Sequence, residues 1–68
     1  MRVQTLNATY EVLDVGDHFE IKIVAQEGMT PAELSQVNVL RTQEVKVVIG
    51  ESASFGGLCT ATVVKIEE

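Results

Sequence analysis

Asp14, Asp17 and His18 are the residues of this 68-residue sequence whose types and spacing come nearest to a metal site. Two carboxylates and an imidazole can bind a divalent cation. Their spacing, however, matches neither the calcium-binding loop nor the zinc-binding helix. The three residues surround Gly16, and aspartates in turns commonly accept hydrogen bonds from their own backbone. We therefore expect a turn here, and we predict no metal and no cofactor.

Gly50-Glu51-Ser52-Ala53-Ser54 is the stretch that comes nearest to a hydrolase motif. It is similar to the G-x-S-x-G nucleophile elbow of serine esterases, in which a strained turn between a strand and a helix exposes the serine. Three features oppose that interpretation. Ser54 stands where the last glycine belongs, the residues that follow read as a strand, and the only histidine, His18, precedes the serine. We therefore predict that the protein is not an enzyme and has no catalytic residues.

Gly56 and Gly57 end the same segment and could let backbone N–H groups approach a phosphate. The phosphate-binding loop requires a lysine and then a serine or threonine after its last glycine, and Leu58-Cys59 stands there instead. Cys59 lies in an apolar run, where a cysteine is expected to be buried as a small hydrophobic residue. Neither nucleotide binding nor thiol chemistry is predicted.

The composition indicates one small domain over residues 1–68. Hydrophobic residues make up 46% of the chain, close to the globular average. One cysteine and one histidine cannot supply an internal disulfide or a structural zinc site. Below about 70–80 residues a single core seldom supplies more than about 3–5 kcal/mol of net stability. Self-association is therefore the expected source of additional stability.

The charge distribution argues against two classes of partner. Ten acidic residues are spread along the chain against five basic ones, for a formal charge of −5. Phosphate contacts come largely from lysine and arginine, so nucleic-acid binding is disfavoured. No run approaches the ~20 apolar residues of a membrane span, and the first residues are too polar for a signal peptide. We expect a cytoplasmic protein, with a place in a virus or phage particle left open.

The first 26 residues predict three strands, over residues 2–6, 9–15 and 19–26. The third has the clearest alternation, because every second residue from Phe19 to Ala25 is apolar on one side. Gly16-Asp17, with glycine first, suits a two-residue turn between the second and third strands. A hairpin over residues 9–26 follows.

Thr30-Pro31-Ala32-Glu33 is the best helix start in the sequence, because it combines a capping threonine, proline at the first helical position and a capping-box glutamate. Leu34, Val37 and Leu40 then recur at helical spacing, which predicts a helix over residues 31–41. The alternative is one helical turn followed by a strand, since Val37 and Val39 also alternate.

The last third predicts two strands, over residues 45–49 and 58–66, joined by a polar loop over residues 50–57. Both strands carry apolar residues on both faces. In the last one, Leu58, Val64 and Ile66 are expected to face one way, and Cys59, Ala61 and Val63 the other. Such a strand is covered on both sides, by the helix, by a closed barrel or by another subunit.

These elements predict an α+β, mainly β fold: a small five-stranded barrel-like antiparallel sheet with one short helix between the third and fourth strands. With a helix over residues 31–41 the layout is that of the oligonucleotide-binding (OB) barrel; with a strand over residues 37–41, an SH3-like or Sm-like barrel fits better. We predict a non-enzymatic protein-interaction or structural domain, as a homo-oligomer or a subunit of a larger assembly. The alternative is a nucleic-acid-binding barrel of OB or Sm type.

Phe55 is the most distinctive candidate for an interface, because it is a large aromatic residue within a polar loop. It either folds back to cap the barrel or projects as an anchor for a partner. The predicted interface residues are Phe55, Val48, Val39 and Leu58.

Overall fold

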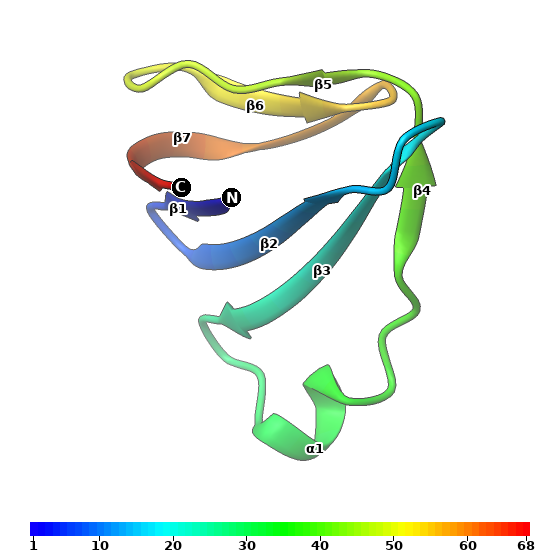
Figure 1. The fold of residues 1–68 in the computed structure, drawn as a ribbon. Helices are drawn as coiled ribbons and strands as arrows, with labels where there is room; N and C mark the ends of the chain where they lie inside the picture. The colour runs from blue at the N-terminus through cyan, green and yellow to red at the C-terminus, as the bar shows by residue number, and fades with distance from the viewer.

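A computed structural model describes residues 1–68 as a mainly β domain with a nearly closed, barrel-like antiparallel sheet (Figure 1). The elements in chain order are β1 (Arg2–Thr5), β2 (Ala8–Asp14), β3 (Phe19–Gln26), α1 (Pro31–Leu34), β4 (Leu40–Thr42), β5 (Val45–Lys46), β6 (Ser52–Phe55) and β7 (Leu58–Glu67). The small barrel-like β fold is confirmed, but the sheet has seven strands where five were predicted. No helix has the length and hydropathy that crossing a membrane would require.

The sheet runs in the order β4-β3-β2-β1-β7-β6-β5, so β4 and β5 are its two edges. These edge strands are consecutive in the chain, and residues 43–44 turn the corner from one to the other. The backbone N–H of Gly56 donates to the carbonyl of Glu44 at 3.0 Å, which ties this corner to the β6–β7 turn. The chain itself thus joins the two edge strands, β4 and β5, at the place where no strand-to-strand pairing connects them.

The predicted hairpin over residues 9–26 is confirmed as β2 and β3, which pair from Asp14↔Phe19 to Ala8↔Gln26. Gly16 has a φ of +106°, a value that glycine adopts without the steric cost of a Cβ. The N–H of Val15 donates to the carbonyl of His18 at 3.1 Å, which closes the turn around Gly16-Asp17. Phe19 and Ile21 face the core as expected, and Ile21 is 4% exposed, but a register shift at Val24 interrupts the predicted alternation and Ala25 is exposed.

The predicted helix over residues 31–41 is wrong beyond its first turn. Its start is confirmed, because Thr30 and Glu33 form a complete capping box around Pro31. The helix ends at Leu34, and β4 then pairs with the first half of β3, with Leu40 opposite Ile21. The alternative of one helical turn followed by a strand is the nearer description. Pairing with β3 satisfies backbone N–H and C=O groups of residues 40–42. In a longer helix these groups would have formed hydrogen bonds within the helix.

The predicted loop over residues 50–57 is also wrong, because β6 occupies residues 52–55 of it. Gly56-Gly57 alone make the turn, with φ values of +61° and +94°, and Phe55 lies directly opposite Leu58. Positive φ at both central residues is the requirement of a tight two-residue hairpin turn. The preceding strand is correspondingly shorter than the predicted residues 45–49, and comprises only Val45–Lys46.

A β-bulge in β7 decides which apolar residues enter the core. Gln4 pairs with Lys65 and Thr5 with Val63, so Val64 is an extra residue without a partner on β1. Val63 is 1% exposed and Ile66 packs against the core, whereas Val64 is 49% exposed. The predicted grouping of Val64 with Ile66 on one face is therefore wrong, because the bulge shifts the alternation by one residue.

The buried core is small. Six residues form it, with partly buried hydrophobic residues around them. The six are Val3, Val12, Ile21, Ala53, Phe55 and Val63. Cys59, expected inside, is exposed, because it pairs with Ser54 on the face of β6 opposite to Phe55.

Gly56→Ala should destabilise the protein more than Gly57→Ala. Both positions have positive φ, so alanine is strained at each by about 1–2 kcal/mol. A Cβ at Gly56 would also collide with Oγ1 of Thr42, whereas nothing lies within 4 Å of a Cβ at Gly57. Thermal melts followed by circular dichroism should give a lower midpoint for Gly56→Ala. Equal midpoints would show that Thr42 moves aside at no cost.

Candidate functional site

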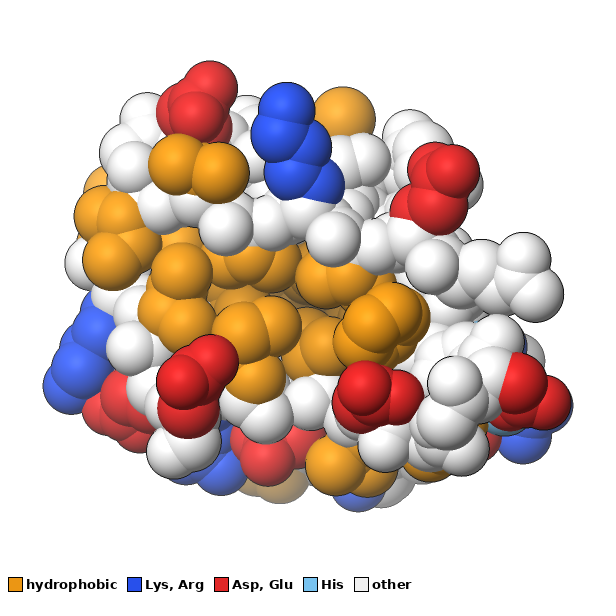
Figure 2. Space-filling view, turned by 45° about the horizontal axis from the view of Figure 1, so that its top comes forward, with side chains coloured by type: hydrophobic (Ala, Val, Ile, Leu, Met, Phe, Trp, Pro, Cys, Tyr) orange, Lys and Arg blue, Asp and Glu red, His pale blue; other side chains and the backbone are white.

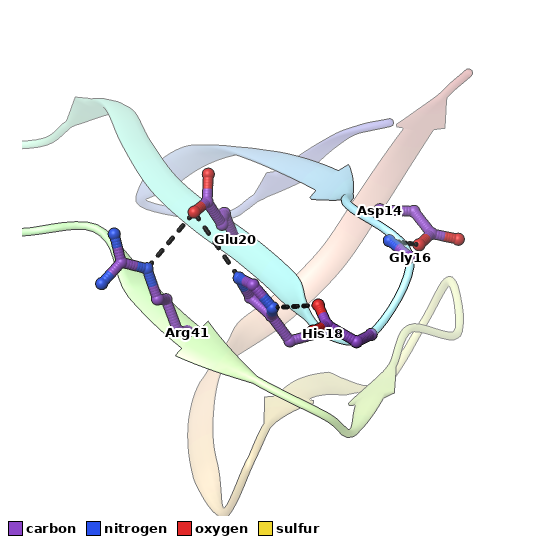
Figure 3. A network of polar contacts seen from close by, with 6 residues as sticks. Asp14, Gly16, His18, Glu20 and Arg41 are labelled. Carbon is purple, nitrogen blue, oxygen red and sulfur yellow. Dashed lines mark hydrogen bonds and ion pairs between the residues drawn. The ribbon is translucent and has the colours of Figure 1, made fainter.

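The β2–β3 turn holds the polar cluster that the sequence singles out (Figure 3). Nδ1 of His18 lies 2.7 Å from Oδ1 of Asp17, and its Nε2 lies 3.6 Å from Oε2 of Glu20. Nε of Arg41, on β4, reaches the same Glu20 oxygen at 3.3 Å. Asp14 is not part of this chain of contacts, because its carboxylate accepts a hydrogen bond from the backbone N–H of Gly16 at 3.0 Å.

This arrangement stabilises the turn and connects β3 to β4. Asp14 behaves as the turn aspartate that was expected. The structure contains no group of three or more histidine, cysteine or acidic side chains that could hold a metal ion. The hydrogen bond from His18, with the attraction of its charged form, lowers the pKa of Asp17 below the ordinary value of 3.8. Glu20 connects the β2–β3 turn to β4, because its carboxylate faces both His18 and Arg41.

His18→Gln should raise the pKa of Asp17 back towards 3.8. A carboxyl whose pKa is lowered by folding stabilises the folded state above its unfolded pKa, and that contribution is lost as pH falls through the folded pKa. The stability that the Asp17 carboxylate contributes is therefore lost at pH values below 3.8. An NMR titration of the Asp17 carboxyl carbon should show a lower midpoint in the wild type than in His18→Gln. Identical midpoints would mean that the 2.7 Å contact does not persist in solution.

The candidate nucleophile Ser52 begins β6 opposite Thr62, and no hydrogen bond joins it to His18. It stands on a strand, beside a register shift between Ser52 and Ser54, and not on a turn between a strand and a helix. Gly56 and Gly57 form the tight turn of the β6–β7 hairpin, where the N–H of Gly56 is already bonded to Glu44. The structure thus separates the residues that could have formed a hydrolase or phosphate site.

The four predicted interface residues do not gather in one place. Phe55 is 1% exposed and packs its ring edge-to-face on Tyr10, with the ring centroids 5.5 Å apart. It therefore folds back into the barrel and presents no surface to a partner. Leu58 is 59% exposed at the β6–β7 turn, Val48 is 41% exposed after β5, and Val39 is 42% exposed before β4.

Phe55→Ala should abolish cooperative folding, whereas Leu58→Ala should leave it intact. Removing a buried phenylalanine costs about 3–5 kcal/mol, which equals the whole stability expected of a core this small. Leu58 is the cross-strand neighbour of Phe55, yet it is largely exposed, so its truncation should cost within about 0.5 kcal/mol. Urea unfolding followed by circular dichroism measures both. A cooperative transition in Phe55→Ala would show that this ring does not hold the core together.

The core is not fully covered by the protein's own surface. Figure 2 shows a hollow with a hydrophobic floor, around which acidic side chains stand. Hydrophobic residues pack against the buried core while remaining partly open to solvent. They are Met1, Tyr10, Phe19, Val45, Val47 and Ile66. Water therefore reaches apolar side chains within one layer of the core.

A second apolar surface lies on the outside of the bend in β7. The N–H of Leu6 donates to the carbonyl of Thr62 at 3.1 Å, and the N–H of Gly50 donates to that of Val63 at 2.9 Å. These bonds hold the backbones of residues 6 and 50 against residues 62 and 63 of β7, next to Val64. In Figure 1 the β1–β2 turn, the bend of β7 and the β5–β6 connection lie at the same end of the barrel. We call this surface the β7 patch, formed by Leu6, Val48, Ile49 and Val64.

The β7 patch contains some of the most exposed large hydrophobic side chains of the molecule. Leu6 is 70% exposed, Ile49 60% and Val64 49%. Of these four residues, only Val48 was predicted from the sequence as an interface residue. The sequence did show that the last strand has apolar residues on both faces. It did not show the β-bulge that turns Val64 outward.

Comparisons with protein-family models, with curated proteins and with solved structures find no match for this chain. The function has to be argued from the geometry alone.

Proposed function

We propose that this chain is a non-enzymatic protein-interaction domain that associates with copies of itself through the β7 patch. The observation that supports this most directly is the clustering of Leu6, Ile49 and Val64, each about half exposed or more, around one point of β7. Large hydrophobic residues scattered singly over a surface are ordinary, whereas a contiguous group of them is typical of a contact site.

Among the charges near the patch, Lys65 is neutralised by a partner, whereas Glu51, whose carbonyl accepts from the N–H of Val63 at 2.9 Å, is in no ion pair. In a two-fold dimer the same patch faces itself, so any excess charge would meet its own sign. Lys65, the residue after Val64, is paired with Glu67 at 2.7 Å. The backbone around Leu6 and Gly50 is already bonded to β7. The patch can therefore meet a second copy without bringing an unpaired charge from β7 into the contact.

The size of the patch sets the expected strength of the contact. A stable interface buries about 1,000 Å² or more in total, and four aliphatic side chains on each copy supply only part of that. We therefore expect a weak dimer whose population depends on protein concentration. Association of this kind would add to the stability of a core of six buried residues by mass action.

The alternative of a nucleic-acid-binding barrel has less support. Binding of single strands without sequence preference relies on exposed aromatic side chains and a cationic groove. Tyr10 and Phe19 pack against the core, and Phe55 lies within it. Arg2, Arg41 and Lys65 are each paired with a glutamate.

The double variant Leu6→Ser/Val64→Ser should shift the protein towards the monomer. Sedimentation over a range of concentrations should give the wild type an average mass that rises above 7.4 kDa, while the double variant stays near it. Leu13→Ser is the matched control, because Leu13 is 52% exposed but lies at the opposite end of β2 from the patch, and it should associate like the wild type.

Two results would overturn this proposal. One is a wild type that remains at 7.4 kDa at every concentration. The other is a double variant that associates as strongly as the wild type, which would place self-association on a different surface.

A further inference from the structure

The outer edge of β3 is only half covered by a neighbouring strand. On one side β2 pairs with β3 from Phe19 to Gln26, with a register shift that leaves Val24 without a partner on β2. On the other side β4 pairs only with residues 19–21. No backbone hydrogen bond outside the ladders involves residues 22–25. The unpaired N–H and C=O groups of this edge can therefore accept another strand.

A groove runs beside this open edge. It has a volume of about 280 Å³ and is lined by Lys22, Ile23, Val24, Pro31, Leu34 and Ser35. Its far wall is α1, which Figure 1 shows below β3 and outside the barrel. None of the residues of α1 is buried, so this helix adds nothing to the core. Its capping box stabilises its single turn, and Pro31 and Leu34 of this turn line the groove.

Lys22 gives the groove a charge that nothing in the protein neutralises. Three of the five cationic side chains are in ion pairs, and Lys22 is not among them. Glu11, which lies opposite Lys22 on β2, is bonded to Arg2 at 3.1 Å. In a chain of net charge −5, this free ammonium at a strand edge favours a partner that carries a negative charge at one position.

The direction of β4 determines which end of a partner would reach Lys22. β4 is antiparallel to β3 and begins at Leu40, opposite Ile21. A strand that continued the line of β4 along residues 22–25 would run in the same direction and would have to stop before Leu40. Its last residue would then lie beside Lys22. A free α-carboxylate is the negative charge that every chain carries at that end.

We propose that the groove between β3 and α1 binds the extended C-terminal tail of a partner protein by strand addition to residues 22–25. The tail's backbone pairs with the open edge, an aliphatic side chain fills the groove, and the terminal carboxylate meets Lys22. This mode of recognition takes its affinity from main-chain hydrogen bonds and its specificity from one side-chain pocket and one terminal charge. It uses a different surface from the β7 patch and does not depend on self-association.

The test measures fluorescence anisotropy of short N-terminally labelled peptides that end in valine, isoleucine or leucine. Each peptide is made with a free carboxylate and with a C-terminal amide. The amides should bind about tenfold more weakly, because they lack the charge that Lys22 meets. Lys22→Gln should weaken the free acids about tenfold and leave the amides unchanged. Lys46→Gln is the matched control, since Lys46 is also unpaired but lies on β5, and it should change neither.

NMR shifts of backbone amides on adding a free-acid peptide should fall on residues 22–25 and 32–35. Three results would overturn the inference: no binding at about 1 mM peptide, equal binding of acids and amides, or shifts confined to another edge such as β5. Leu6→Ser/Val64→Ser should bind the peptides as the wild type does. If self-association failed, peptide binding would thus be unaffected. If peptide binding failed, self-association through the β7 patch would be unaffected.

Discussion

The contact on which this fold depends is the packing of Phe55 against Tyr10 across the inside of the barrel. Phe55 belongs to β6 and Tyr10 to β2, two strands that are separated in the sheet by β1 and β7. Their edge-to-face contact therefore joins the two sides of the barrel across its interior and not along the ladder. A chain of 68 residues can bury few side chains, and here only eight residues are buried at all. The aromatic pair adds about 0.5–1.5 kcal/mol to the stability that the burial of Phe55 itself supplies.

The small interior also explains why so many apolar side chains remain exposed on the outside of the barrel. Strands with aliphatic residues on both faces can direct only one face inward. The bulge at Val64 lets Val63 and Ile66 both reach the core, and the cost is that Val64 points outward. Leu6 and Ile49 then lie beside it because their segments bond to the same part of β7. The β7 patch is thus a direct consequence of how this strand fills a narrow interior.

Much of this fold could be predicted from the sequence, and the errors have identifiable causes. The hairpin of β2 and β3 and the capping box at Thr30 depend on local patterns, and both were found. The length of the helix was missed, because β4 is held by pairing with β3, which no local pattern encodes. β6 was missed because Ser52, Ala53 and Ser54 resemble a loop, although they pair with β7. Tertiary pairing outweighed local propensity in each case.

The candidate surfaces were harder to predict than the fold, because they depend on register. Val48 and Leu58 were found as exposed apolar residues, but sequence alone could not place them on different parts of the barrel. Phe55 was weighed both as a cap and as an anchor, and its burial follows from the pairing of β6 with β5 and β7, which no local pattern reveals. The groove beside β3 could not be predicted for the same reason, since it exists only because β4 begins no earlier than Leu40.

The corner that closes the barrel also leaves β3 open. After Thr42 the chain turns at once into β5, and the side chain of Thr42 bonds to both the N–H and the carbonyl of Glu44. Gly56 approaches the same threonine so closely that no side chain fits between them. This corner fixes where β4 ends, and the approach from α1 lets it begin only at Leu40. With both ends fixed, β4 is too short to cover β3. An unprotected strand edge is ordinarily a risk of aggregation, and natural sheets usually cover it. Here α1 stands beside the open edge, and the groove between them is lined by residues of both elements.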